Sequence, residues 1–194
     1  MVQVKRETVR NAILDSARDL FSERGYHGTT LLDIADITGI GVSSLYSYFP
    51  SKIHLLYAVV EPWQKGAFAR LETRVGALPN RREKLRCMLL GIWRDMPTEN
   101  IGLANSLMEA LASADPAQKK PSPLLRWTEE RLMDMLGTIM PPCSGKTIDY
   151  ALLPNLFMMA YDGFVINRRL NDLRDIENLV ETICDMMLGS PDRT

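Results

Sequence analysis

The chain has 194 residues, a length that predicts one domain, or a small domain attached to a larger one. Hydrophobic residues make up 46% of it and charged residues 24%, which excludes a wholly disordered, collagenous or low-complexity chain. The 23 lysines and arginines are balanced by 24 aspartates and glutamates, so the bulk charge does not indicate a nucleic-acid partner. Evidence for such a partner must come from the pattern of residues.

The amino terminus lacks the apolar run of a secretory signal, and no stretch approaches the roughly 18 apolar residues of a membrane span. We therefore expect a soluble cytoplasmic protein with no membrane partner. Cys87, Cys143 and Cys184 form neither a disulfide framework nor a metal-binding CxxC spacing, and each is expected to be a small buried hydrophobe. No metal or other cofactor is predicted.

Apolar residues recur at helical spacing from the amino terminus onward. The first stripe predicts a helix that stops at Gly25, and its members are Ile13, Leu14, Ala17, Leu20 and Phe21. Thr30 and Asp33 then have the spacing of a capping box, which predicts a short helix over Leu31–Thr38.

Gly39 breaks this helix, and Gly41 opens a second short helix over Val42–Tyr48. Two short helices joined by a tight turn are the plan of a helix-turn-helix motif, whose second helix enters the major groove of DNA. Three small or apolar residues are expected to pack inward and hold the pair together: Ile34, Ala35 and Leu45.

The rest of the chain also has helical periodicity, without a convincing strand. The expected helices cover Lys52 into the sixties or seventies, 85–93, 101–114, 124–140, 147–170 and 176–187. Pro62 is expected to kink or divide the first of these, and Pro97 to stop the second. The predicted fold is all-α with about nine helices. A three-helix DNA-binding head, residues 1–51, precedes an effector-binding and dimerisation body, residues 52–194.

The head resembles the DNA-binding head of the TetR (tetracycline-repressor) family of bacterial transcription regulators. The resemblance covers residues 8–57 in the family's order and spacing, and it rests on Ile13-Leu14, Ala17, Leu20-Phe21, Gly25-Tyr26, Gly28-Thr29-Thr30, Ile34-Ala35, Gly39, Leu45-Tyr46, Tyr48-Phe49 and Lys52. The remaining residues resemble the family only in helix count, length and the Asp162-Gly163 step. The family pattern usually has Ser where Gly41 stands, and a polar or basic residue at Val42.

The resemblance implies a set of DNA contacts. Val42 and Ser43, which begin the recognition helix, are expected to face base edges. Phosphates or flanking bases are the expected partners of the remaining candidates, which are Thr30, Gly41, Ser44, Tyr46, Ser47, Tyr48, Lys52, Arg6 and Arg10. A plain solvated or core role is the alternative for each of these side chains.

The last two expected helices are the candidates for a homodimer interface, because they are apolar over most of their surface. The family resemblance implies the same arrangement, and a twofold dimer predicts a palindromic operator in double-stranded DNA. The candidate interface residues are Leu156, Ala160, Gly163, Phe164, Ile176, Leu179, Val180, Ile183 and Met187. The alternative is that these helices complete the core of a monomer.

The body holds all three tryptophans and ten of the eleven methionines, a composition that suits an apolar cavity but is equally typical of a plain core. The family resemblance implies a small effector that releases a repressor from DNA, and the composition of the body favours a largely apolar one. Our hypothesis is that the effector acts by tilting the helix that contains Pro62. The candidate effector-binding residues are Trp63, Met88, Trp93, Asn105, Met108, Glu109, Trp127, Phe157, Tyr161 and Asp162.

Three other functions are weighed against this one. The sequence has no GxSxG, HExxH or glycine-rich phosphate loop, so an enzyme is not predicted. A redox sensor that uses the cysteines would be found by thiol titration with and without peroxide. The main alternative is a DNA-binding protein of the same fold without an effector, a constitutive or architectural factor.

Overall fold

The computed structural model describes residues 2–113, 123–140, 150–171 and 175–189, with side chains from Arg6 onward. Helices account for almost all of this part of the chain, and no strand occurs in it, as the predicted all-α class requires. The helices form two compact units: residues 1–65 with 100–119, and residues 66–99 with 120–194. None of the described helices is long and apolar enough to cross a membrane. Cys143 lies outside the described residues.

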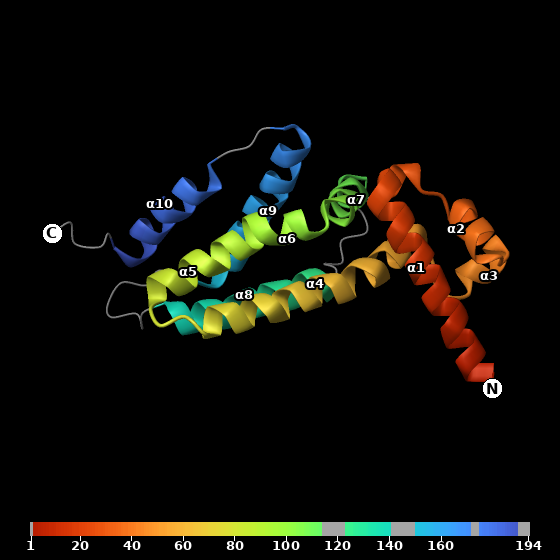
Figure 1. Cartoon of the computed structure of the whole chain (residues 1–194), viewed down its shortest axis with the longest axis horizontal. Helices are drawn as coiled ribbons and strands as arrows, with labels where there is room; N and C mark the ends of the chain where they lie inside the picture. The colour runs from red at the N-terminus through yellow and green to blue at the C-terminus, as the bar shows by residue number, and fades with distance from the viewer. Residues whose placement is uncertain (1, 114–122, 141–149, 172–174, 190–194) are drawn as a thin grey trace. The chain divides into compact units, whose positions relative to one another are not determined.

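Unit 1 contains α1 (Val2–Gly28), α2 (Leu31–Thr38), α3 (Val42–Tyr46), the start of α4 (Lys52–Gly76) and α7 (Ile101–Ala112). Figure 1 shows α2 and α3 beside α1, with α7 against its carboxyl-terminal part. The core of this unit is built on the predicted stripes, and its fully or almost fully buried side chains include Ile13, Ala17, Leu20, Phe21, Ile34, Ala35, Leu45 and Phe49.

Local signals set the ends of these helices. Gly25 has φ 75° and ψ 174°, a backbone conformation that ends the regular turn of α1 where the sequence predicted the stop. Gly39 is left-handed at φ 69° and ψ 22° and closes α2. Helix α3 ends at Tyr46 rather than at the predicted Tyr48, because Ser47 and Tyr48 form a turn that leads into α4.

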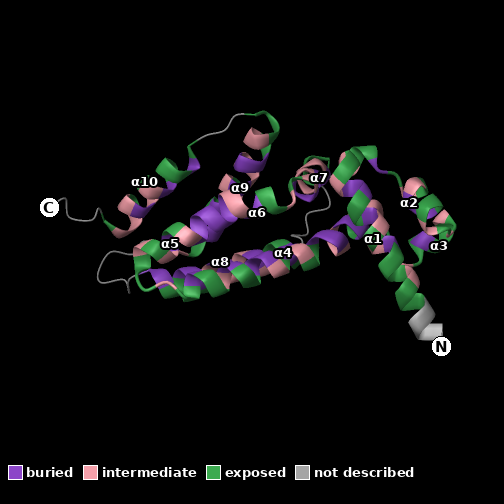
Figure 2. Cartoon of the chain, viewed as in Figure 1, coloured by how far each residue is buried: buried purple, intermediate pink, exposed green. Residues whose placement is uncertain are grey.

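Unit 2 contains the rest of α4, then α5 (Arg81–Leu90), the π-helix η1 (Gly91–Asp95), α6 (Met96–Glu99), α8 (Pro123–Ile139), the short 3-10 turn η2 (Tyr150–Leu152), α9 (Leu153–Arg169) and α10 (Ile176–Leu188). Figure 2 shows buried and exposed positions side by side on α9 and α10, so each helix has one covered and one open face. Helix α10 packs on α5, where Arg82 pairs with Glu181 at 2.7 Å and with Asp185 at 2.6 Å.

Pro62, Pro97 and Pro154 affect their helices in different ways. Helix α4 is continuous through the exposed Pro62 and is not divided there. Pro97 does not stop the chain's helix; instead the turn before it widens into η1, in which the Met96 amide donates to the carbonyl of Gly91, five residues back. Proline lacks an amide hydrogen and its ring crowds the preceding turn, which a wider turn relieves. Pro154 lies in the first turn of α9, which begins at Leu153 rather than at the predicted Thr147; residues 147–149 are outside the described range.

Candidate nucleic-acid interface

The α2–turn–α3 segment is fixed by a complete capping box. The Thr30 hydroxyl accepts from the Asp33 amide at 3.1 Å, and Asp33 Oδ2 accepts from the Thr30 amide at 2.8 Å. The Thr30 hydroxyl also donates to Asp33 Oδ2, at 2.6 Å. This bond and the one from the Thr30 amide lower the pKa of the Asp33 carboxyl, so it stays ionised at the amino terminus of α2, where the helix dipole favours a negative charge. The sequence predicted both partners and the short helix that they begin.

Substituting Thr30 by Ala is expected to reduce the free energy of unfolding by about 1 kcal/mol, because one amide of α2 loses its acceptor. Thr30→Ser keeps the hydroxyl and should stay within a few tenths of a kcal/mol of the wild type. Urea unfolding followed by circular dichroism compares the three proteins. Equal losses in both variants would show that the hydroxyl does not carry the cap.

Helix α3 presents a small polar face. Ser43, Ser44, Tyr46 and Ser47 are exposed, whereas Leu45 is fully buried and anchors the helix to the core. The Ser47 hydroxyl donates to the Ser44 carbonyl at 2.6 Å, so it is already partly used within the helix. At the start of α3, Val42 is half-buried, and Gly41 gives no side-chain cap.

Two arginines of α1 lie beside the end of α3. The Arg6 guanidinium is 5.8 Å from the centre of the Tyr48 ring, and that of Arg10 is 5.4 Å from the Phe49 ring. Both arginines are exposed, so these cation–π contacts orient the guanidinium groups without removing them from solvent. The structure therefore gathers these cations with the polar face of α3, which spacing alone did not predict.

Lys52 is placed differently from a free surface lysine. Its ammonium donates to the carbonyls of Tyr26 at 2.7 Å and Thr29 at 2.9 Å, and lies 4.1 Å from the centre of the Tyr26 ring. Burial lowers the pKa of this ammonium, and the carboxylate of Glu109 partly offsets the effect. Since an ammonium has three donors, at most one is left for a phosphate.

The structure does not bring all the predicted effector-binding residues together. Asn105, Met108 and Glu109 lie on α7 in unit 1. In unit 2, the Trp93 indole donates to the carbonyl of Phe157 at 3.0 Å, and Trp127 packs edge-on against Phe68.

The remaining predicted effector-binding residues differ in exposure. Met88 is fully buried in α5, and Trp63 is half-buried in the part of α4 that belongs to unit 1. Tyr161 and Asp162 lie on α9 in unit 2. Burial raises the pKa of the Tyr161 hydroxyl and that of the half-buried Asp162 carboxyl.

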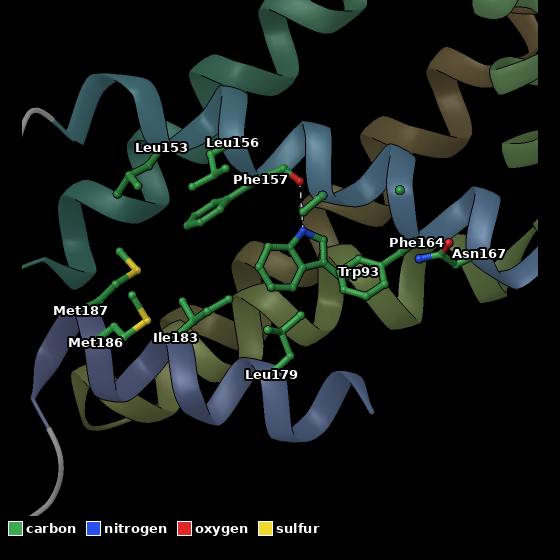
Figure 3. Close-up of a pocket in the computed structure, with 12 residues that line it drawn as sticks. Trp93, Leu153, Leu156, Phe157, Phe164, Asn167, Leu179, Ile183, Met186 and Met187 are labelled. Carbon is green, nitrogen blue, oxygen red and sulfur yellow. Dashed lines mark hydrogen bonds between the residues drawn. The ribbon is translucent and has the colours of Figure 1, made fainter. Parts of the chain in front are cut away.

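An apolar trough of about 460 Å³ lies between α9 and α10. Figure 3 shows Trp93 at its floor, with Leu153, Leu156 and Phe157 of α9 across from Leu179, Ile183, Met186 and Met187 of α10. Seven of the nine predicted interface residues line it: Leu156, Ala160, Gly163, Phe164, Leu179, Ile183 and Met187. The other two, Ile176 and Val180, are buried inside unit 2 instead.

A second apolar feature runs along α9 beside the trough. Its members recur at intervals of four and three residues and are termed the α9 stripe: Leu152, Leu156, Met159, Gly163, Ile166 and Leu170. The five large side chains are between 49% and 71% exposed in the single chain. This 3.5-residue period is typical of a seam between helices. The sequence analysis missed four of these residues and Met186, although the heptad spacing was visible in the sequence.

Comparison with known proteins bears on both units. Residues 13–59 match the family model described as bacterial regulatory proteins, tetR family. The repressor KstR of Rhodococcus jostii is 24% identical over 186 residues, which cover 95% of this chain and 84% of that protein. The regulator RutR of Escherichia coli is 47% identical over 51 residues, only 24% of its length.

Solved structures establish the similarity of fold over almost the whole chain. A TetR-family regulator from Pectobacterium atrosepticum has a TM-score of 0.70 at 22% identity and covers 97% of this chain and 98% of its own. FadR of Bacillus subtilis, solved in complex with stearoyl-CoA, has a TM-score of 0.63 at 17% identity, with 93% and 98% covered.

The described helices thus form one unit with a helix-turn-helix motif and a second unit that is also all-helical. Residues 13–59 therefore match the DNA-binding domain of the TetR family of bacterial regulatory proteins, and almost the whole chain shares the fold of TetR-family regulators.

Proposed function

We propose that the protein is a homodimeric repressor that binds a palindromic DNA operator through α3 and leaves it when a small, largely apolar effector binds unit 2. The single observation that carries this proposal is the open apolar face of α9 and α10, in a chain whose other unit is built for reading DNA. One α3 helix reads one half-site, and the second half-site needs a second copy.

The DNA contacts follow from the exposed groups of unit 1. Ser43 and the half-buried Val42 begin α3, where they meet base edges; the methyl groups of Val42 suit a thymine methyl. Arg6 and Arg10 supply cations for the phosphates on either side. Because Lys52 is held by two carbonyls, it acts mainly by fixing the entry to α2.

The dimer is supported by the α9 stripe and the trough. Contiguous apolar patches of this kind are rare on monomeric soluble proteins. A second copy related by a twofold axis would place its own α9 stripe on this one and its apolar side chains in the trough. We therefore assign the trough to the partner helices rather than to the effector.

We propose that the effector binds within unit 2, at Tyr161 and Asp162 of α9. Buried aromatic and methionine side chains offer an apolar lining, and the Asp162 carboxyl offers a polar anchor. The stearoyl-CoA bound by FadR of Bacillus subtilis shows what a protein of similar fold accommodates. An effector that tilts α4 changes the separation of the two α3 helices, which must stay near one turn of DNA, about 34–36 Å.

Selection of a randomised duplex pool on the purified protein tests the DNA part. The expected result is a palindromic consensus with half-sites about one helical turn apart. No enrichment, or a consensus without symmetry, would contradict the proposal. Stearoyl-CoA is then the first compound to test for release, because a protein of similar fold was solved in complex with it. A compound that leaves operator affinity unchanged at saturation is not an effector. If no apolar compound releases the operator, the constitutive factor is the better description.

A further inference from the structure

We propose that Glu109 of α7 is a positioning residue for operator binding, which braces the turn between α1 and α2 from outside the helix-turn-helix. This inference rests on the proposed DNA-binding function. Glu109 lies 61 residues beyond the last residue of the predicted recognition helix, yet α7 and the helix-turn-helix belong to the same compact unit.

One face of α7 follows the carboxyl-terminal part of α1. Gly102 approaches so closely that an added Cβ would lie 2.1 Å from the carbonyl oxygen of Ser22. One turn further, the buried Ser106 hydroxyl donates to the carbonyl of Phe21 at 2.7 Å. Because Gly102 and Ser106 are small, α7 lies directly against the α1 backbone. This close packing fixes the position of Glu109 relative to α1.

Glu109 meets the chain where Gly25 interrupts α1. Its Oε2 accepts from the His27 amide at 3.2 Å, and a Cβ added at Gly25 would lie 2.9 Å from the same oxygen. A second contact of α7 follows at Ser113, whose hydroxyl lies 2.9 Å from His27 Nε2. The His27 amide, two residues past the break at Gly25, is therefore bound by α7.

The same turn is held on its other side by Lys52, which binds the carbonyls of Tyr26 and Thr29. The Thr29 hydroxyl closes it further by donating to the carbonyls of Leu20 at 3.1 Å and Gly25 at 2.9 Å. Glu109 thus binds an amide of the turn, and Lys52 binds two of its carbonyls. The next residue in the chain is Thr30, the cap of α2.

The charge of Glu109 argues that its role is geometric. A carboxylate close to the carboxyl end of a helix is disfavoured by the helix dipole, and one close to DNA repels phosphate. If repulsion of phosphate were its only effect, removing the charge would tighten DNA binding. If Glu109 instead braces the turn, its removal should weaken DNA binding. A loosened turn would let the cap of α2, and α3 with it, move away from the arrangement that binds DNA.

The test compares Glu109→Ala with Glu109→Gln in the full chain on the selected duplex. Glu109→Ala should weaken binding about tenfold, since it removes the acceptor for the His27 amide. Glu109→Gln keeps an acceptor and should bind within about threefold of the wild type. The control is Leu111→Ala, an exposed residue on α7, which should bind as the wild type does. Equal or tighter binding by Glu109→Ala, or equal losses in both variants, would overturn the inference.

The His27 amide resonance in the DNA-free protein separates this inference from the proposed function. It should move upfield in Glu109→Ala, and much less in Glu109→Gln, whether or not the protein binds DNA. Failure of the wild type to enrich any duplex would overturn the DNA-binding proposal, and an unmoved resonance would overturn the brace. Thermal unfolding of each variant shows that the compared proteins are folded.

Discussion

Met159→Glu is expected to turn the proposed dimer into monomers. Met159 is 71% exposed in the single chain and stands in the middle of the α9 stripe, so the change leaves the fold of the subunit intact. In a twofold interface each substitution is present twice, and two carboxylates would be desolvated against apolar side chains. The dissociation constant of the dimer should rise at least about a thousandfold, or roughly 4 kcal/mol.

Sedimentation at a range of protein concentrations measures this effect, and operator binding should fall with it. A monomer grips one half-site only, so the affinity for the palindrome should drop by about a hundredfold or more. The matched control is Leu125→Glu, the same kind of change at an exposed residue of α8 that belongs neither to the α9 stripe nor to the lining of the trough. A dimeric Met159→Glu protein would refute the assigned interface.

Gly102→Ala is expected to cost about 3 kcal/mol of the free energy of unfolding, near the upper end for overpacking. The added methyl would lie 2.1 Å from a backbone oxygen of α1, and the backbone cannot rotate away as a side chain can. The α1–α7 contact must open to admit it. We therefore also expect weaker operator binding, because Glu109 moves with α7.

Two other glycines provide matched controls for this loss. At Gly91 an added methyl would meet the Leu71 side chain at 2.3 Å, a flexible group that can shift at a smaller cost. At Gly137 nothing lies within 4 Å, and alanine should stabilise the helix by about 0.5–1 kcal/mol. In urea unfolding, the free energy of unfolding should decrease in the order Gly137→Ala, wild type, Gly91→Ala and Gly102→Ala. A neutral Gly102→Ala protein would contradict the close helix approach.

The sequence predicted well those features that depend on neighbouring residues. Thr30, Asp33 and Gly39 delimit α2 as expected, because caps and left-handed turns are determined within a few residues. The apolar stripe of α1 likewise predicted its buried face, whereas only Ile176 and Val180 of the α10 stripe are buried. The π-helix before Pro97 was not predicted, since a proline can be accommodated by stopping a helix or by widening it, and local pattern does not distinguish the two.

Features that depend on distant contacts could not be predicted in the same way. Gly102 and Ser106 look like ordinary helix residues in the sequence, and their packing on α1 is visible only in the fold. Lys52 has the spacing of a phosphate contact, but carbonyls from the α1–α2 turn take up two of its donors. The candidate effector residues were chosen by type, which does not say which unit each belongs to.

Binding of the wild-type protein to its selected duplex across a salt series tests the central claim most directly. A dimer that neutralises several phosphates per subunit should give a slope of about −6 for log K against log salt. A steep slope of this size, with two chains bound per palindrome, is the result expected of a dimeric operator-binding regulator. A slope near zero would contradict DNA binding through this interface.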